Sequence, residues 1–183
     1  MKKIFVFLAE GFEEIEAITT IDLLRRAGAE VTTVAVNASA TVKGAHGIPV
    51  VADKLIGDIL ATSADAYVLP GGLPGVTNLA ADERLKTLLK SAYQEDRLLA
   101  AICAAPSIFG GLGILSGKAA TCYPSFEPTL EGATPLDEAV VVSGRVITGR
   151  SAGVTIDFAL AIIKELIGQE AADSVAQAII VKS

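Results

Sequence analysis

The sequence contains little cysteine, little histidine and no excess of basic residues. Its 183 residues include 2 cysteines and 1 histidine, and no Cys/His cluster has the spacing of zinc ligands. The N-terminal residues show no signal-peptide pattern, and two cysteines do not predict a disulfide framework. We therefore expect a cytoplasmic protein that holds no metal.

Charge and hydropathy exclude two further classes of protein. Lys and Arg total 15 against 21 Asp and Glu, a formal net charge of −6, so the chain lacks the basic surface of a nucleic-acid-binding protein. Its apolar runs are too short to span a bilayer, and the positive mean hydropathy of +0.54 fits buried strands and alanine-rich helices. We expect neither nucleic acid nor a membrane as a partner.

Strand-like and helix-like patterns alternate along the chain, without an internal repeat, a linker or a low-complexity tract. We expect a single domain over residues 1–183, of the α/β class, with a mainly parallel sheet and helices on both faces. The expected strands are 4–8, 30–36, 66–69, 98–102, 119–121, 140–142 and 146–148, with a hairpin or excursion at 42–51. The expected helices are 14–27, 55–60, 83–93, one that begins near residue 104, 152–167 and 171–178.

One cysteine lies where an apolar strand gives way to a helix. The run Leu98–Ile102 is typical of a strand buried on both faces of a parallel sheet, and Cys103 follows it. Pro106 fits the first turn of a helix that begins near Ala104. Because a helix N-terminus favours the thiolate, we expect a lowered pKa and a nucleophilic role for Cys103. The alternative is a small apolar side chain in the core, since free cysteine is often buried.

A second strand end predicts a pocket beside this cysteine. The apolar run Tyr67–Leu69 ends at Pro70, Gly71 and Gly72, and glycines let a backbone approach a ligand closely. In open parallel sheets, ligands bind beyond the carboxyl ends of the strands. We expect the N–H groups of Gly72 and Ala104 to form an oxyanion site there, with Gly71 in the pocket wall.

Four glutamates follow the first expected strand: Glu10, Glu13, Glu14 and Glu16. The general preference of carboxylates for a helix N-terminus explains at least three of them. Glu16 differs because it lies in the helical turn that faces the strand ends, provided that Ile15, Ile18 and Leu23 pack inward. In that arrangement Glu16 reaches Cys103.

Four segments, in this order, resemble the ThiJ/PfpI superfamily in its parkinsonism-associated deglycase branch. They are Ala9–Glu16, Val68–Gly72, Ala100–Pro106, and Thr148–Gly153 with Asp157–Leu160, so the resemblance extends essentially from end to end. It implies a flavodoxin-like sandwich fold and a homodimer. It also implies that Cys103 is the reactive cysteine and that Glu16 is the carboxyl group that hydrogen-bonds to it.

The pairing of Glu16 with Cys103 has an electrostatic consequence. An ionised carboxylate beside the thiol disfavours the thiolate, so we expect Glu16 to be protonated when the sulfur is charged. Partial burial would raise the pKa of Glu16 and let it donate a hydrogen bond to the sulfur. The two groups would then titrate as a coupled unit.

The chain departs from patterns of the superfamily at two positions. Ala104 stands where the peptidase-like branch has a histidine, which disfavours that branch. Tyr123 stands where some deglycase-branch members have a histidine before the proline of the same loop. The only histidine, His46, lies in the excursion after the second strand, where we expect a solvated turn or a subunit contact rather than catalysis.

Two further residues have alternative roles. Arg150, at another strand end, either binds an anionic group or carbonyl oxygen of a substrate, or forms a salt bridge to the first-turn glutamates or across the dimer. Cys122 lines the pocket from the next loop or is a buried or peripheral thiol. Tyr123 and Arg150 are thus candidate pocket residues.

The resemblance implies small dicarbonyls such as glyoxal and methylglyoxal, or their early adducts with amines and thiols, as substrates. The residues predict the nucleophile Cys103, the oxyanion site and the acid/base role of Glu16. On the substrates that the resemblance implies, Cys103 would attack the aldehyde, Glu16 would move protons, and water would release a hydroxy acid without a cofactor. One alternative is a redox sensor or stress-protective chaperone in which Cys103 is oxidised to sulfinate. A third reading is an inactive structural relative with ordinary thiol reactivity.

Overall fold

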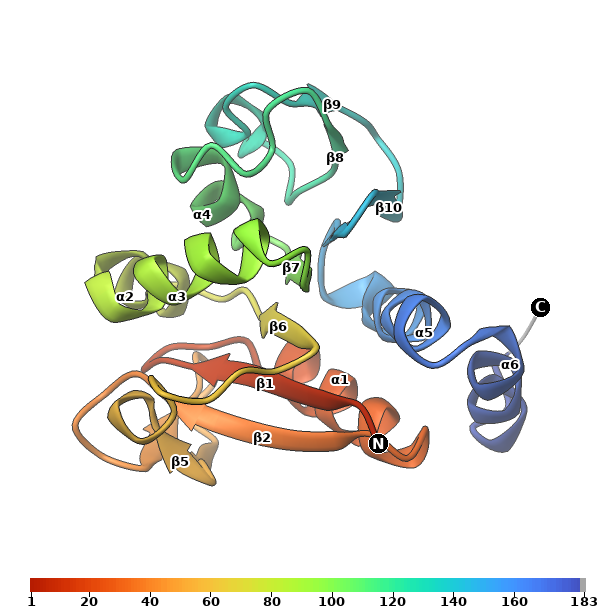
Figure 1. The fold of residues 1–183 in the computed structure, drawn as a ribbon, viewed down its shortest axis with the longest axis horizontal. Helices are drawn as coiled ribbons and strands as arrows, with labels where there is room; N and C mark the ends of the chain where they lie inside the picture. Colours follow the sequence, from red (N-terminus) through yellow and green to blue (C-terminus); the bar gives the residue numbers. More distant parts are fainter. Residues whose placement is uncertain (182–183) are drawn as a thin grey trace.

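The computed structural model describes residues 1–181 and contains a seven-stranded sheet with the order β10-β11-β7-β6-β1-β2-β5 (Figure 1). Its strands are β1 (Lys3–Leu8), β2 (Glu30–Ala35), β5 (Lys54–Leu55), β6 (Ala66–Leu69), β7 (Leu98–Ile102), β10 (Val140–Ser143) and β11 (Val146–Gly149). All neighbours pair in parallel except β10 and β11. The α/β class and the mainly parallel sheet are confirmed.

Helices cover both faces of this sheet, as expected. They are α1 (Glu14–Arg26), α2 (Gly75–Ala81), α3 (Glu83–Gln94), α4 (Pro106–Gly111), α5 (Thr155–Leu166) and α6 (Gln169–Ala178). Phe5 and Phe7 of β1 pack into one core cluster with residues of α2, α3 and α4, while Ile4 and Val6 pack into another with residues of α1, α5 and α6. Side chains alternate between the faces of a strand, so an apolar run such as β1 stabilises both layers.

Several expected elements differ in the structure. The short helix expected near 55–60 is a 3₁₀ turn, η1 (Ile56–Asp58), and the short strand β5 precedes it. Helix α2 was not predicted, because Pro74 and Gly75 at its start are typical of a loop. The expected helix at 152–167 begins as a 3₁₀ turn, η3 (Ala152–Val154). The strand expected at 119–121 is β8 (Ala119–Ala120), which lies outside the main sheet and pairs with β9 (Thr134–Pro135). A further 3₁₀ turn, η2 (Glu127–Thr129), lies between these two strands in the sequence.

The excursion after β2 is an antiparallel hairpin, β3 (Thr41–Lys43) and β4 (Pro49–Val51), as predicted. It folds back onto the loop after β1, where Gly11 N–H donates to Lys43 O at 2.8 Å and Ala45 N–H donates to Phe12 O at 2.8 Å. The hairpin loop therefore lies beside the N-terminus of α1.

Across residues 1–181, no helix combines the length and the apolar character needed to cross a bilayer.

Candidate active site

Cys103 lies directly after β7 in a backbone conformation that few L-residues adopt. Its φ is +67°, in the left-handed region. This conformation costs a non-glycine residue about 1–2 kcal/mol, so the surrounding structure must hold it. Cys103 N–H donates to Gly149 O at 3.0 Å, and Tyr123 N–H donates to Cys103 O at 2.8 Å. The end of β11 and the loop after β8 thus fix the backbone of the cysteine.

The helix that follows Cys103 is shorter and starts later than expected. It begins at Pro106, with Ala105 as its N-cap, and has 6 residues. Cys103 is therefore outside the first helical turn. The groups that stabilise negative charge on its sulfur are instead the N–H groups of Ala104 and Gly72, which lie near it and lower its pKa. These are the two residues expected to form the oxyanion site.

Glu16 lies beside this thiol and is almost completely buried, with 1% of its surface exposed. Its Oε2 accepts a hydrogen bond from Gly71 N–H at 2.7 Å. Its Oε1 is buried without a hydrogen-bond partner of ordinary geometry in the described chain, and the Cys103 thiol is close enough to interact with the carboxyl group. The expected meeting of Glu16 with Cys103 is present.

Burial raises the pKa values of both groups, and the charge of Glu16 raises that of Cys103 further. Desolvation raises the pKa of Glu16 to about 7, although the Gly71 N–H and the Cys103 thiol oppose this shift. Desolvation, and next the charge of Glu16, raise the pKa of Cys103 to about 12 against the N–H groups of Ala104 and Gly72. The expectation of a helix-lowered cysteine pKa is therefore wrong, while the raised pKa of Glu16 is as predicted. Above pH 7, the pair carries one negative charge and retains one proton.

The orientation of α1 differs from the expectation that led to Glu16. Ile15 and Ile18 do not pack inward, because 56% and 42% of their surfaces are exposed. Leu23 is buried, together with Glu16 and Thr20 on the same helical face. The polar residues Glu16 and Thr20 therefore belong to the face that packs against the sheet.

Gly71 allows the close approach of these groups. A Cβ at this position would lie 2.5 Å from Glu16 Oε2, 2.6 Å from Cys103 Cβ and 3.0 Å from Ile102 O. No side chain fits in that space, since real Cβ atoms do not approach other heavy atoms so closely. The glycine is thus required for the contact between β6, α1 and the cysteine.

The remaining candidate residues lie around this centre. Tyr123 is 47% exposed, and its ring packs edge-to-face against Phe126 with the centroids 6.5 Å apart. Arg150 Nη1 pairs with Asp137 Oδ1 at 2.6 Å, so its salt bridge is not to the first-turn glutamates. Cys122 is 1% exposed, and burial raises the pKa of its thiol to about 11, which fits the buried alternative.

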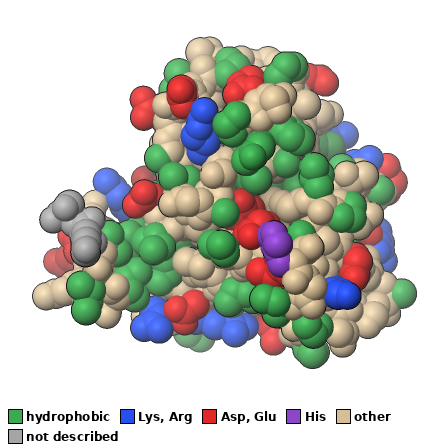
Figure 2. All heavy atoms as spheres, turned by 180° about the vertical axis from the view of Figure 1, so that it is seen from behind, with side chains coloured by type: hydrophobic (Ala, Val, Ile, Leu, Met, Phe, Trp, Pro, Cys, Tyr) green, Lys and Arg blue, Asp and Glu red, His purple; other side chains and the backbone are tan. Residues whose placement is uncertain are grey.

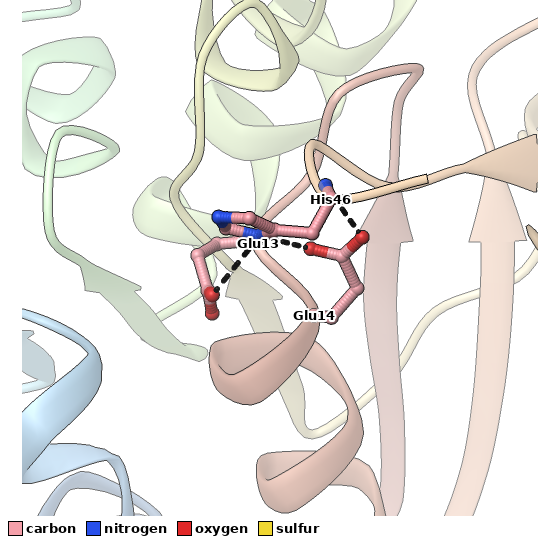
Figure 3. Close-up of side chains that lie close together, drawn as sticks. All are labelled: Glu13, Glu14 and His46. Carbon is pink, nitrogen blue, oxygen red and sulfur yellow. Dashed lines mark hydrogen bonds and ion pairs between the residues drawn. The ribbon is translucent and has the colours of Figure 1, made fainter. Parts of the chain in front are cut away.

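A second polar cluster lies at the N-terminus of α1 and was missed in the sequence. Glu13, Glu14 and His46 converge there from the helix and the β3–β4 loop (Figure 3). His46 Nδ1 is 2.9 Å from Glu14 Oε2 and 3.8 Å from Glu13 Oε1. The side chain of His46 is 71% exposed, and Figure 2 shows this histidine at the surface beside acidic side chains. It is a turn residue, as expected, but it is paired with carboxylates.

Comparison with known proteins places the chain in a family. The model of the DJ-1/PfpI family matches residues 2–165. The chain belongs to this family. It is 40% identical to Protein DJ-1 homolog B of Arabidopsis thaliana over 99% of its length, but it spans only 42% of that longer relative. It is 36% identical to the protein named glutathione-independent glyoxalase DJR-1.2 of Caenorhabditis elegans, over 90% of this chain and 88% of that protein.

A solved structure supports the fold assignment. The structure described as Toxoplasma gondii DJ-1, oxidized, superposes with a TM-score of 0.97 at 34% identity and covers 100% of both chains. The flavodoxin-like fold implied by the resemblance is therefore confirmed.

Proposed function

We propose that this member of the DJ-1/PfpI family is a cysteine-dependent, cofactor-independent enzyme. Its substrates would be small dicarbonyls such as glyoxal and methylglyoxal, or their early adducts with amines and thiols, and its products hydroxy acids. The observation that carries the proposal is the convergence of the Gly72 and Ala104 N–H groups on the Cys103 sulfur, with Glu16 beside it. The name of the nematode relative, a glutathione-independent glyoxalase, supports the choice of substrate.

The first step uses the proton that the Cys103–Glu16 pair retains. As the sulfur attacks the aldehyde carbon, Glu16 takes the thiol proton, the S–C bond forms, and the carbonyl electron pair moves onto oxygen. A preformed thiolate is not needed. The N–H groups of Gly72 and Ala104 are the donors available to the new oxyanion, which Glu16 then protonates to give a hemithioacetal.

The second step is an internal redox change that needs no outside oxidant. Glu16, again ionised, removes the hydrogen of the former aldehyde carbon as a proton, and the C–H electron pair forms a C=C bond while the ketone oxygen takes up the negative charge. Glu16 then returns this proton to the neighbouring carbon, and the hydroxyl proton of the hemithioacetal passes to the former ketone oxygen. The aldehyde carbon is oxidised to a thioester while the ketone carbon is reduced to an alcohol. Water then cleaves the C–S bond, which yields the hydroxy acid and the Cys103 thiol.

Lactate formation from methylglyoxal without glutathione tests this proposal. Wild type should form lactate, Cys103→Ser should form none, and Cys122→Ser is the matched control because its thiol is buried away from the pair. A wild type that forms no lactate, or a Cys103→Ser variant with wild-type turnover, contradicts the proposed enzyme.

A second candidate function, redox sensing or stress-protective chaperone activity, would use the same sulfur. Two equivalents of peroxide would each transfer one oxygen atom to Cys103 and leave as water, giving a sulfinate. The structure of the Toxoplasma gondii relative is that of an oxidized form, which favours testing this role. Intact mass after mild peroxide treatment should show two added oxygen atoms at Cys103 and none at Cys122. Unchanged mass at Cys103 counts against this role.

We further propose a cytoplasmic homodimer of single-domain chains. Both cysteines are free thiols, which supports a reducing compartment. Exposed apolar side chains lie on α1 and on the adjacent hairpin, including Ile15, Ile18 and Ile48. Ile48 lies next to the helix because its N–H contacts Glu14 Oε1 at 3.4 Å. An apolar surface of this kind is typical of subunit contacts.

A further inference from the structure

We propose that Glu13, Glu14 and His46 form a binding site for a divalent transition-metal cation such as Zn²⁺. The three residues offer one imidazole nitrogen and two carboxylate oxygens, all within 4.8 Å of one another (Figure 3). This site is separate from the proposed nucleophile, and it would stand whether or not the chain acts on dicarbonyls.

The distances between the donor atoms fit a common metal centre. Ligand atoms about 2.1 Å from a tetrahedral metal lie about 3.4 Å from one another. Here His46 Nδ1 is 2.9 Å from Glu14 Oε2 and 3.8 Å from Glu13 Oε1, which brackets that separation. A movement of the exposed His46 ring by about 1 Å at most would make the two distances equal.

The backbone orients both carboxylates toward this centre. Glu14 Oε1 accepts hydrogen bonds from the N–H groups of His46 at 2.7 Å and Ile48 at 3.4 Å, so Oε2 is the oxygen that faces the imidazole. Glu13 Oε2 accepts from Glu16 N–H at 2.7 Å, and among residues 1–181 no hydrogen bond reaches its Oε1. In each carboxylate, backbone N–H groups hold one oxygen, and the other oxygen faces the imidazole. Hydrogen-bond partners outside the coordination shell orient metal ligands in the same way.

The charges of the cluster also favour a cation. Both carboxylates are largely covered, with 14% of the Glu13 and 8% of the Glu14 side chain exposed. Within the described chain, no Lys or Arg forms an ion pair with either of them, and His46 is their common partner. With a neutral imidazole the cluster carries two negative charges, which one divalent cation balances.

The donor types select the class of metal. Imidazole nitrogen favours zinc, cobalt, nickel and copper over magnesium and calcium, which prefer oxygen ligands alone. His46 also lines a surface cavity of about 520 Å³ with Gly11, Lys43 and Pro74 among its other lining residues. The imidazole side of the cluster is therefore open to solvent.

Metal binding to the full-length chain, stripped with EDTA, tests the site directly. We expect calorimetry to show one equivalent of Zn²⁺ bound. Because the chain has 1 histidine, the imidazole NMR signals report on His46 alone, and saturating Zn²⁺ should shift them. Co²⁺ should bind without the near-ultraviolet charge-transfer absorption that thiolate ligands produce.

Variants separate this site from its neighbours. His46→Ala should weaken Zn²⁺ binding by about tenfold or more, and should fold normally because the side chain is exposed. Glu10→Gln is the matched control: its carboxylate lies nearby and accepts Lys43 N–H, but it is not a proposed ligand, so binding should match wild type. Cys103→Ser should also bind like wild type.

Three results would overturn the proposal. These are no stoichiometric Zn²⁺ binding by wild type, imidazole signals that do not move, and equal binding by wild type and His46→Ala. Binding that disappears in Cys103→Ser would assign the metal to the thiol and would also refute the site. In that outcome the cluster is an ion pair only.

Discussion

Replacing Gly71 with alanine should damage both the fold and the reactive pair. The added methyl group would lie 2.5 Å from Glu16 Oε2 and 2.6 Å from Cys103 Cβ. Neither neighbour can easily move away, because the carboxyl group is buried and the cysteine backbone is held by Gly149 and Tyr123. Relief of the clash therefore requires a shift of α1 or of the turn at Cys103.

The expected magnitude follows from overpacking in other protein cores. An extra methyl group in a well-packed interior typically costs about 1–3 kcal/mol. For a chain of this size, each kcal/mol lowers Tm by about 2–4 °C, so Gly71→Ala should melt about 2–12 °C below wild type. The same shift should separate Glu16 from the Gly71 N–H and slow the alkylation of Cys103.

Thermal unfolding and the rate of iodoacetamide reaction at Cys103 measure the two effects. Gly111→Ala is the matched control, because a Cβ there meets no atom within 4 Å and the residue ends α4 without a positive φ. This control should be as stable as wild type or slightly more stable. If Gly71→Ala keeps both the wild-type Tm and the wild-type alkylation rate, the proposed close packing around the pair is refuted.

Three further predictions concern protonation, the second thiol and assembly. Burial raises the pKa of Glu16 from its usual 4.5 to about 7, so between these pH values the folded chain holds a proton that the unfolded chain has lost. The free energy of unfolding should therefore fall as the pH rises from 4.5 to about 7. Urea unfolding at several pH values should show a fall of at most about 3 kcal/mol that Glu16→Gln abolishes, and a fall that persists in the variant refutes the assignment. Peptide mapping after limited alkylation should find Cys103 modified before Cys122, because Cys122 is 1% exposed, and the reverse order contradicts the structure. The double variant Ile15→Glu/Ile18→Glu should sediment as a monomer where wild type is a dimer, and an unchanged dimer places the contact elsewhere.

The strand ends of the candidate site could be predicted from the sequence because local patterns determine them. Apolar runs identify β6 and β7, and the residues after these runs must meet at one edge of a parallel sheet. Cys103 and Gly72 follow those runs directly. The backbone that surrounds the sulfur was therefore predictable, whereas the pKa of the thiol was not. That property depends on the degree of burial and on where α4 begins.

The rotation of α1 was not predictable from apolar periodicity. A helix normally buries its isoleucines, yet Ile15 and Ile18 are exposed while Glu16 and Thr20 face the sheet. Ile15 and Ile18 lie on the face that we propose as the subunit contact, while the proposed chemistry uses the carboxyl group on the face toward the sheet. Functional sites are where such local rules are expected to fail.

Contacts between distant segments explain the remaining omissions. His46 meets Glu14 across 32 residues because the β3–β4 hairpin folds over the loop after β1, and no local pattern encodes that return. Burial does provide a signal once the fold is known: within the described chain, Glu14 and Glu16 are the only charged residues in the buried class. Burying a carboxylate is costly unless something compensates for its charge. Each of the two lies in one of the proposed sites, with a thiol that shares its proton or an imidazole that shares its charge. These two buried carboxylates are therefore the positions where the proposed chemistry gives a reason for the burial.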